Sequence, residues 1–308
     1  MEIAFAAAFD TFIADCKARG LRDSSIYKYR LLFKQLQAFA EQQGRRYVRE
    51  SDLDWLRSFR VTWPNASLSA SKKLGCLKSF FRFAHESGWI DNNPTLNIKP
   101  PKVIERQVMP FTDDEVSRIV AASDLYPDRK NAIRVRALVL LLRHSGLRIR
   151  DAVTLSRDRI SADKLFLYTG KSGTPVRCPL PSSVLVALNS IPKNGKHYFW
   201  TGDSKPKGAV GNWQRALKKL FALAKVPTGH AHRFRHTLAV SLLQAGVPLE
   251  RVAVLLGHRS VKVTEKFYAS WSKSRQEQLE ADIRHTWNEP STEAKGTREV
   301  HERPRYLN

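Results

Sequence analysis

Apolar residues recur at helical spacing through the first third of the chain. The segments FAAAFDTFIADCKA, IYKYRLLFKQLQAFAEQQG and LSASKKLGCLKSFFRFAHESG each place apolar side chains three or four residues apart, which is the spacing of an amphipathic helix. Glycines stand where these helices would end, at Gly20, Gly44 and Gly88, because glycine readily adopts the conformation that closes a helix. The pattern predicts an all-helical domain over residues 1–98.

A proline-containing segment separates this domain from the rest of the chain. The stretch NIKPPKVIERQVMP holds three prolines and charges of both signs, a composition that favours an extended linker, and we place the linker at residues 99–110. Thr112 and Glu115 follow with the spacing of a capping box, in which each side chain accepts a hydrogen bond from the other residue's backbone N–H. A second domain is therefore expected over residues 111–272, beginning with a helix.

The second domain combines helical patterns with one short hairpin. VRALVLLLRHSG predicts a buried helix that ends at Gly146, and KLFLYTGKSGTPVRCPL predicts a β-hairpin with Lys171 and Gly173 at its turn. The expected fold class is mainly α, with a small β-sheet in this mixed α/β domain. Further helices are predicted at residues 182–190, 211–225, 233–245 and 249–256.

Two different patterns follow the second domain. WSKSRQEQLEADIRHTW predicts an amphipathic helix, over residues 273–287, with Leu279, Ile283 and Trp287 on one face. This apolar stripe needs a partner, either its own domain or a neighbouring subunit. Residues 288–308 are polar and interrupted by proline and glycine, which predicts a disordered tail.

The chain is strongly basic. With 52 Lys+Arg against 29 Asp+Glu its formal net charge is +23, and residues 109–272 alone hold 27 basic and 11 acidic side chains. A charge of this size attracts polyanions, so nucleic acid is the expected partner. Membrane binding is disfavoured, because no apolar run approaches the ~20 residues of a spanning helix and the charge is spread over both domains.

Cysteine usage and the N-terminus indicate the compartment. Cys16, Cys76 and Cys178 lie far apart without CxxC spacing, so neither a disulfide framework nor a thiolate metal site is suggested. The opening MEIAFAAAFD has an apolar run but no basic region before it, unlike a secretory signal. We expect a mature, cytoplasmic protein.

Arg148, His232 and Arg235 suit phosphoryl transfer. Two arginines that keep their charge can hold a phosphodiester through bidentate hydrogen bonds to its nonbridging oxygens, and the spacing of His232 and Arg235 places them on one face of a helix. Fixed guanidinium groups stabilise the transition state without a metal, so no cofactor and no metal are expected. Tyr268 could form a covalent ester, but with a pKa of about 10 it needs a base, for which His232 is the candidate.

Several motifs, taken in order, resemble a known family. Residues 230–268, HAHRFRHTLAVSLLQAGVPLERVAVLLGHRSVKVTEKFY, combine a His-x-x-Arg pair, a Leu-Gly-His and a tyrosine, and SGLRIRDAVTL and TGKSGTPVRCPL precede them. This order resembles the tyrosine recombinase (phage integrase) family. The resemblance implies a SAM-like core-binding domain, a catalytic domain, and a site-specific DNA recombinase that exchanges strands between two duplex sites through a 3′-phosphotyrosyl intermediate.

The resemblance also implies roles for single residues and for partners. Tyr268 would be the nucleophile, Lys171 at the hairpin tip would protonate the departing 5′ oxygen, and His258 would hydrogen-bond the scissile phosphate. Asp151, three residues after Arg148, would hold a catalytic arginine or histidine in place. The implied partner is double-stranded DNA at specific recombination sites, which could belong to a phage, an integron, an island, a transposon or a system of chromosome-dimer resolution. The chain would act there as a homotetramer whose C-terminal helix docks on a neighbouring subunit, with accessory DNA-bending proteins as further candidates.

Three alternatives compete with this interpretation. His232 and His236 are spaced like the two ligands of a zinc hydrolase helix, but arginines stand where a glutamate would be expected and would repel a dication. A topoisomerase-like enzyme would use the same chemistry to relax DNA without exchange, although the chain length and the lack of extra domains favour a recombinase. A non-catalytic DNA-binding protein on the same scaffold would lack a catalytic residue, and none is missing.

Overall fold

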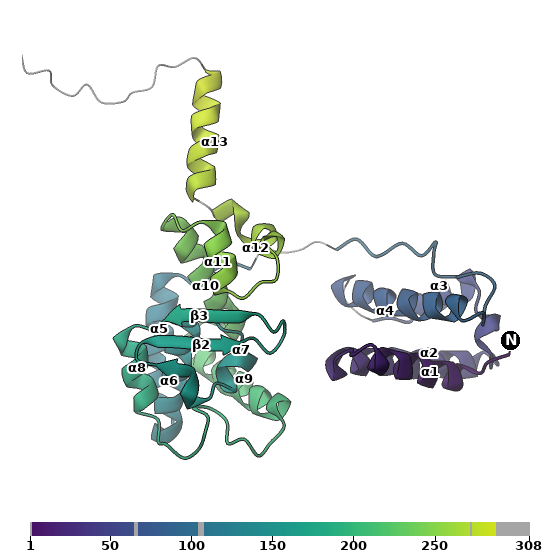
Figure 1. The fold of residues 1–308 in the computed structure, drawn as a ribbon, viewed down its shortest axis with the longest axis horizontal. Helices are drawn as coiled ribbons and strands as arrows, with labels where there is room; N and C mark the ends of the chain where they lie inside the picture. The colour runs from purple at the N-terminus through teal and green to yellow at the C-terminus, as the bar shows by residue number, and fades with distance from the viewer. Residues whose placement is uncertain (1, 65–66, 104–107, 272, 288–308) are drawn as a thin grey trace, which may run out of the picture. The chain divides into compact units, whose positions relative to one another are not determined.

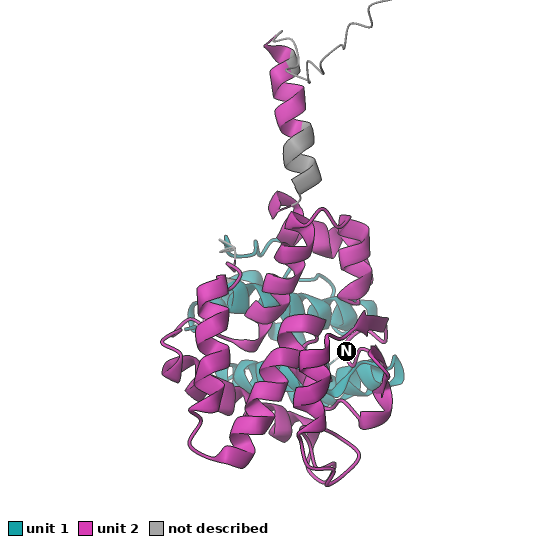
Figure 2. Ribbon diagram, turned by 90° about the vertical axis from the view of Figure 1, so that its left-hand side faces the viewer, with its two compact units in different colours: residues 1–106 teal, residues 107–308 magenta. Residues whose placement is uncertain are grey.

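The structure, a computed structural model, describes residues 2–64, 67–103, 108–271 and 273–287. The chain forms two compact units, Met1–Arg106 and Gln107–Asn308, which Figure 2 shows in different colours. Each unit has a hydrophobic core of its own. The linker predicted at 99–110 lies partly outside the described residues, and the tail predicted at 288–308 lies wholly outside them.

Unit 1 is a bundle of helices (Figure 1). Its elements are, in chain order, α1 (Phe5–Ala18), α2 (Asp23–Gln42), the short 3-10 helix η1 (Val48–Glu50), α3 (Leu53–Val61) and α4 (Ser67–Glu86). Helix α1 packs against both α2 and α4. The three amphipathic segments of the sequence are these three helices.

Aromatic side chains form the centre of unit 1. Phe9 of α1 stacks on Phe33 of α2 with ring centroids 4.1 Å apart. Phe12 of α1 meets Phe80 of α4 edge to face at 5.7 Å. All four rings are buried, and rings of this size each remove roughly 150–250 Å² from water. The apolar stripes of the three helices therefore share one core.

Unit 2 packs helices around a small antiparallel sheet. In chain order its elements are α5 (Asp113–Asp124), α6 (Arg129–Ser145), α7 (Ile149–Val153), η2 (Arg157–Arg159), β1 (Ile160–Ser161), β2 (Lys164–Tyr168), β3 (Pro175–Pro179), α8 (Ser182–Asn189), α9 (Pro206–Leu223), α10 (Ala231–Gln244), α11 (Leu249–Leu255), α12 (Val261–Tyr268), η3 (Ala269–Trp271) and α13 (Lys273–Thr286). The sheet order is β1-β2-β3, with Leu165 opposite Cys178. The predicted fold class, mainly α with a small sheet, is confirmed.

Helix α6 runs through the middle of this unit. Its Leu138, Leu141 and Leu142 are fully buried, and the helix packs against α5, α8 and α10. It ends at the predicted place, where Gly146 adopts a left-handed conformation with φ 60°. The buried side chains of β2 and β3 alternate with exposed ones, as expected for a sheet with one face on the core.

Some element boundaries differ from the prediction. Helix α9 begins at Pro206 and not at residue 211, because proline is well suited to the first helical turn and the two glycines that follow are tolerated there. Helix α10 begins at Ala231, two residues before the predicted start. Strand β1 was not predicted, since two residues are too few to show an alternating pattern.

The C-terminal helix α13 covers most of its predicted range. The side chains of its apolar stripe are exposed: Leu279 by 58%, Ile283 by 38% and Trp287 by 62%. The stripe therefore does not pack on its own unit, which was one of the two alternatives. Docking on a neighbouring subunit stays a prediction.

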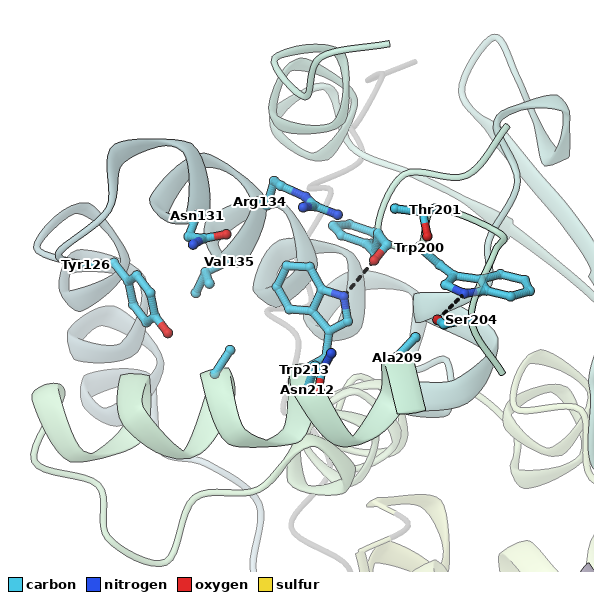
Figure 3. Close-up of a pocket in the computed structure, with 12 residues that line it drawn as sticks. Tyr126, Asn131, Arg134, Val135, Trp200, Thr201, Ser204, Ala209, Asn212 and Trp213 are labelled. Atoms are coloured by element: carbon cyan, nitrogen blue, oxygen red, sulfur yellow. Dashed lines mark hydrogen bonds between the residues drawn. The ribbon is translucent and has the colours of Figure 1, made fainter. Parts of the chain in front are cut away.

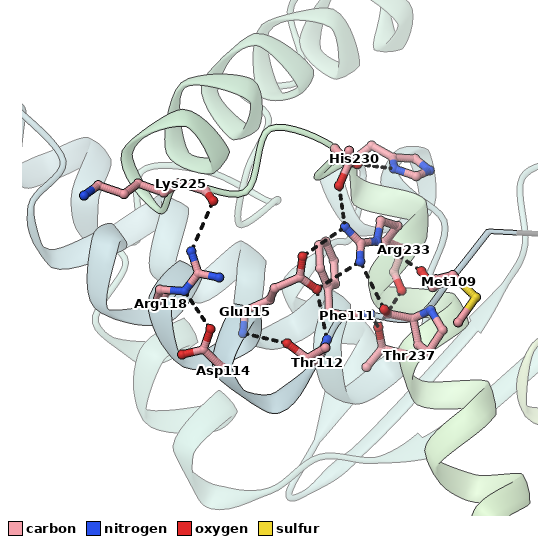
Figure 4. Close-up of polar contacts among 12 residues, drawn as sticks. Met109, Phe111, Thr112, Asp114, Glu115, Arg118, Lys225, His230, Arg233 and Thr237 are labelled. Carbon is pink, nitrogen blue, oxygen red and sulfur yellow. Dashed lines mark hydrogen bonds and ion pairs between the residues drawn. The ribbon is translucent and has the colours of Figure 1, made fainter.

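A mostly buried ion pair joins the start of α5 to α10 (Figure 4). The capping box is present: Thr112 Oγ1 accepts from the Glu115 N–H at 3.1 Å, and Glu115 Oε2 accepts from the Thr112 N–H at 3.0 Å. Glu115 Oε2 also lies 2.9 Å from Arg233 Nη2. Arg233 further donates to the carbonyl oxygens of Met109 and Pro110. This network fixes the first turn of α10 against the start of the unit.

We expect Arg233→Met to lower the free energy of unfolding by about 2–4 kcal/mol, because it leaves the mostly buried Glu115 carboxylate without its ionic partner. Arg136→Met is the matched control. Arg136 pairs with Asp124 at 2.8 Å, but that pair is exposed and such pairs contribute about 0–1 kcal/mol. Urea denaturation measures both losses, and equal losses would contradict the structural role given to Arg233.

Candidate active site

Arg235 is the buried centre of the site. It is 3% exposed, and its guanidinium donates from Nη1 to the carbonyl oxygen of Gly146 at 2.9 Å and from Nη2 to that of Leu256 at 2.6 Å. These two residues end α6 and α11, where carbonyl groups lack partners within the helix and carry partial negative charge. Burial, followed by the charge of Arg148, lowers the pKa of Arg235 to about 10. The side chain is therefore still charged at neutral pH.

The end of α6 can approach Arg235 because residue 146 is glycine. A Cβ on Gly146 would lie 3.0 Å from Leu238 Cδ2 and 3.2 Å from Leu256 Cδ2, and the left-handed backbone there disfavours other residues. The close contact of α6 with α10 and α11 thus depends on this glycine.

His258 binds Arg235 with one ring nitrogen and Thr264 with the other. Its Nε2 lies 2.7 Å from Arg235 Nη2, and its Nδ1 lies 2.7 Å from Thr264 Oγ1. A guanidinium can only donate, so Nε2 is the acceptor and the ring is neutral, with its proton on Nδ1. Burial, followed by the charge of Arg235, lowers the pKa of His258 to about 4, in agreement with a neutral ring. Both ring nitrogens of His258 are thus engaged, so its predicted contact with a phosphate requires one of these two hydrogen bonds to be exchanged.

Tyr268, the last residue of α12, lies inside a small apolar cluster. It is 3% exposed and packs with residues of α10 and α11, among them Val240, Leu243 and Leu256. Burial raises the pKa of its phenol to about 12, while the positive charges of Arg235 and Arg148 act in the opposite direction. The phenol is thus within electrostatic reach of both arginines but is covered by protein.

His236 connects His232 to Tyr268 through ring contacts. The rings of His232 and His236 meet edge to face at 4.8 Å, and those of His236 and Tyr268 lie 5.3 Å apart. Loss of water around each ring, followed by neighbouring charges, lowers both histidine pKa values to about 4. His232 as a whole residue is exposed, but its ring packs against His236, and the positive charge of Arg235 acts on its pKa in the same direction as the loss of water there. Both rings are neutral at neutral pH, so His232 can accept a proton.

Arg148 and Asp151 lie at the start of α7, Arg148 as its N-cap and Asp151 in its first turn. Arg148 is the residue before the helix, and its Nη1 is buried without a hydrogen-bond partner among the described residues. Asp151 is 7% exposed, and its Oδ1 accepts from the backbone N–H of Gly170 at 2.8 Å. It forms no hydrogen bond to an arginine or histidine in the described part of the chain, where its Oδ2 has no partner. The hydrogen bond of Asp151 goes to the hairpin backbone, while its negative charge acts on Arg235. Its predicted support of a catalytic arginine or histidine stays a prediction.

Lys171 is exposed at the turn between β2 and β3. The turn is attached to the Leu-Gly-His segment: Arg259 donates to the carbonyl oxygen of Ser172 at 2.8 Å, and Ser172 Oγ donates to that of Gly257 at 3.3 Å. A Cβ on Gly257 would lie 2.7 Å from a side chain of β3. The charge of Lys171 acts on His258, so the hairpin brings this lysine to the other residues.

The structure collects the predicted residues from distant parts of the chain. They come from the starts of α7 and α10, the β2–β3 turn, the segment after α11 and the end of α12; they are Arg148, Lys171, His232, Arg235, His258 and Tyr268. The group combines fixed positive charge, neutral histidines and a phenol. This chemistry suits a phosphodiester anion. Within the described residues, no cluster of three or more His, Cys, Asp or Glu side chains is placed to hold a metal.

A separate cavity of about 330 Å³ lies between α6 and α9 (Figure 3). Arg134, Trp200 and Trp213 are among its lining residues, and the predicted catalytic residues are not. Arg134 stands twelve residues before Gly146 along α6, which at about 1.5 Å per residue is roughly 18 Å. The cavity is therefore distinct from the site.

Two members of the site were not identified from the sequence. His236 contacts Tyr268, and Thr264 holds His258. A signal for both exists: each stands four residues from a predicted catalytic residue on the same helix, and such pairs share a helix face. Their roles depend on contacts between helices, which this spacing does not reveal.

Comparison with known proteins gives consistent matches. The sequence model of the phage integrase family matches residues 110–275. The tyrosine recombinase XerC of Roseiflexus sp. (strain RS-1) is 29% identical over 277 residues, which cover 84% of this chain and 86% of the relative.

Solved structures of lambda integrase have a similar fold. A dimer bound to a COC′ core site gives a TM-score of 0.70 at 16% identity, covering 86% of this chain and 77% of that one. A tetramer bound to a Holliday junction gives a TM-score of 0.67 at 18% identity, covering 84% of this chain and 78% of that one. At these identities the likeness concerns the fold.

The free energy of unfolding should rise with pH between about 4 and 6.5. The ordinary histidine pKa is 6.5 and that of His236 in the folded chain is about 4, so in this window the unfolded chain binds a proton that the folded chain does not. His236→Phe keeps a ring against Tyr268 but removes this difference, and up to about 1.4 kcal/mol per pH unit of the slope should disappear. Urea denaturation at several pH values measures the slope.

The exposed His85 of unit 1 provides the matched control for this measurement, as His85→Gln. Equal slopes for the wild type and His236→Phe would contradict a neutral, buried His236.

Proposed function

The chain belongs to the phage integrase family, and from this premise we propose that the residues around Arg235 are the active site of its DNA cleavage reaction. The protein is a site-specific tyrosine recombinase, an enzyme that cleaves and rejoins DNA strands. The observation that carries the assignment of the site is a buried guanidinium next to an unpaired donor: Arg235 is held by helix ends, and Arg148 Nη1 has no partner in the described part of the chain. A phosphodiester supplies the missing acceptor.

In the proposed reaction, Tyr268 Oη attacks the scissile phosphorus. A bond forms between Oη and phosphorus, and the bond from phosphorus to the 5′ oxygen breaks. His232 Nε2 or Nδ1 takes the phenol proton, and Lys171 Nζ gives a proton to the departing 5′ oxygen. Arg148 and Arg235 stabilise the charge on the nonbridging oxygens. A 5′-hydroxyl of the partner duplex then reseals the strand by the reverse steps, and the phosphotyrosyl link retains the bond energy.

The DNA itself adjusts the proton affinities in this mechanism. In the free protein the pKa of His232 is about 4, and positive neighbours contribute to that value. A bound phosphodiester brings negative charge, which offsets these neighbours and favours the protonated imidazole. His232 therefore becomes a stronger base when substrate is present.

Tyr268 must leave its apolar cluster to reach a phosphate, because it is 3% exposed in the free protein. Leaving the cluster also removes the main cause of its raised pKa, which is burial. Movement of α12 on DNA binding thus exposes and activates the same group.

The proposed assembly is a homotetramer on two double-stranded DNA sites, with accessory DNA-bending proteins as further partners. The net charge of +23 favours duplex binding, and the lambda integrase structures contain dimers and a tetramer on DNA. The exposed stripe of α13 provides a surface for contact between subunits. No helix in the described ranges is both long and apolar enough to cross a membrane.

A DNA-relaxing enzyme without strand exchange would use the same chemistry, and no observation favours it. The two functions are separated with supercoiled plasmids that carry one or two cleavage sites. A recombinase yields exchanged products from the two-site plasmid, whereas a topoisomerase-like enzyme relaxes both plasmids and exchanges neither.

We expect Tyr268→Phe to bind DNA as the wild type does and to form no covalent adduct, because the phenylalanine ring keeps the packing and lacks the nucleophilic oxygen. The protein is incubated, without metal, with a library of nicked duplexes carrying randomised sites, and SDS-resistant protein–DNA adducts are collected and sequenced. The matched control is Tyr168→Phe, at an exposed tyrosine of β2, which should form adducts normally. Adducts from Tyr268→Phe would assign the nucleophile elsewhere, and tight DNA binding without any wild-type adduct would favour a binding protein.

A further inference from the structure

Asp151 is a buried carboxylate that the proposed reaction does not use. Its exposed fraction is 7%, and it lies on α7 one turn after Arg148. The sequence resemblance implied that it holds an arginine or a histidine. Its Oδ1 accepts the backbone N–H of Gly170 at 2.8 Å. The residue therefore binds the segment immediately before Lys171.

The turn that carries Lys171 is anchored on both sides of this residue. On one side Gly170 donates to Asp151 Oδ1. On the other side the Ser172 carbonyl accepts from Arg259 at 2.8 Å, and Ser172 Oγ donates to the Gly257 carbonyl at 3.3 Å. The backbone of Lys171 is thus held between α7 and the segment after α11, while its side chain stays exposed.

Hydrogen bonds within the turn connect its two anchored ends. Thr169 Oγ1 and Ser172 Oγ lie 2.7 Å apart, Thr174 Oγ1 donates to Ser172 Oγ at 2.7 Å, and the Gly173 N–H donates to the Thr169 carbonyl at 2.8 Å. Because the turn is a closed hydrogen-bonded unit, moving one anchor changes the position of the whole turn.

Gly170 permits the contact with Asp151 because it has no side chain. A Cβ built on Gly170 would lie 3.0 Å from Asp151 Oδ1, which is tighter than an ordinary van der Waals contact. A larger residue at this position would therefore move the carboxylate or the turn backbone by a few tenths of an ångström.

We propose that Asp151 is a positioning residue for Lys171: by binding the Gly170 N–H it places the turn so that Lys171 Nζ can protonate the 5′ oxygen as the bond from phosphorus breaks. This inference rests on the proposed function, in which Lys171 is the general acid. Asp151 then serves the departure of the leaving group. Its negative charge also acts on Arg235, and Asp151→Asn, which removes that charge but keeps an acceptor oxygen, separates the two effects.

A substrate with sulfur in place of the bridging 5′ oxygen tests this role. A thiol has a pKa of about 8.5 and leaves as a thiolate without a proton from the enzyme, so a general acid is no longer needed. The experiment measures single-turnover cleavage rates of the full-length protein on nicked duplexes that carry the selected site, with either bridging oxygen or bridging sulfur.

On the oxygen substrate, Lys171→Ala should lose about 10²–10⁴-fold in rate, the usual contribution of a general acid. Asp151→Ala should lose about 10–100-fold, because a displaced acid of this kind costs up to about that factor. Asp151→Asn keeps an acceptor oxygen for the Gly170 N–H and should retain most of the rate. On the sulfur substrate, Asp151→Ala and Lys171→Ala should both cleave within about threefold of the wild type.

Two further variants make the result decisive. Asp163→Ala removes one negative charge from the exposed turn before β2 and should behave as the wild type on both substrates. Gly170→Ala displaces the turn without changing Asp151, and it should be slow on oxygen and normal on sulfur, even if Asp151→Ala fails to fold. A folded Asp151→Ala protein whose rate loss on the sulfur substrate equals its loss on the oxygen substrate would overturn the proposal. The same result for Gly170→Ala would also overturn it. Failure of the wild type to cleave either substrate would instead contradict the proposed function.

Discussion

The buried guanidinium of Arg235 is the interaction on which the site depends. Moving a charge out of water costs several kcal/mol, so a guanidinium that is 3% exposed requires close partners. The carbonyl groups of Gly146 and Leu256 supply them and hold the ends of α6 and α11 against α10. Arg148 lies two residues after Gly146, and His258 lies two residues after Leu256. One arginine therefore sets the positions of proposed catalytic residues on two other elements.

The way in which this charge is held explains the electrostatics of the site. Carbonyl dipoles orient Arg235 without neutralising it, and Arg148 adds a second charge that acts on His232, His258 and Tyr268. Histidines beside these two positive charges stay neutral. His258 shows this, because its Nε2 accepts a hydrogen bond from Arg235 and a protonated ring has no acceptor nitrogen. Near Arg235 the positive charges of Arg148 and Arg235 are accompanied by the carboxylate of Asp151. In the proposed reaction a phosphodiester offsets the remaining positive charge and favours proton transfer to His232 at the same time.

The sequence predicted the helices better than the contacts between residues of the site. Apolar spacing identified α1, α2 and α4, and the left-handed Gly146 was found as the end of α6, because these features depend on residues near each other in the chain. The partner of Asp151 could not be predicted, since Gly170 reaches it only after the hairpin folds back onto α7. The start of α9 was placed at residue 211, five residues too late, because the apolar pattern does not register the suitability of Pro206 for a first helical turn.

The location of Tyr268 in the unit reconciles its burial with its proposed chemistry. It packs in a small cluster formed by α10, α11 and α12, which is separate from the main core around α6. Withdrawing a ring from the main core would open a cavity among fully buried side chains, at a cost of about 3–5 kcal/mol for an aromatic residue. Withdrawing Tyr268 disturbs only a peripheral cluster, and segments with few buried contacts open with the smallest free energy. In the proposed reaction, burial in this cluster keeps Tyr268 unreactive until DNA binding releases it.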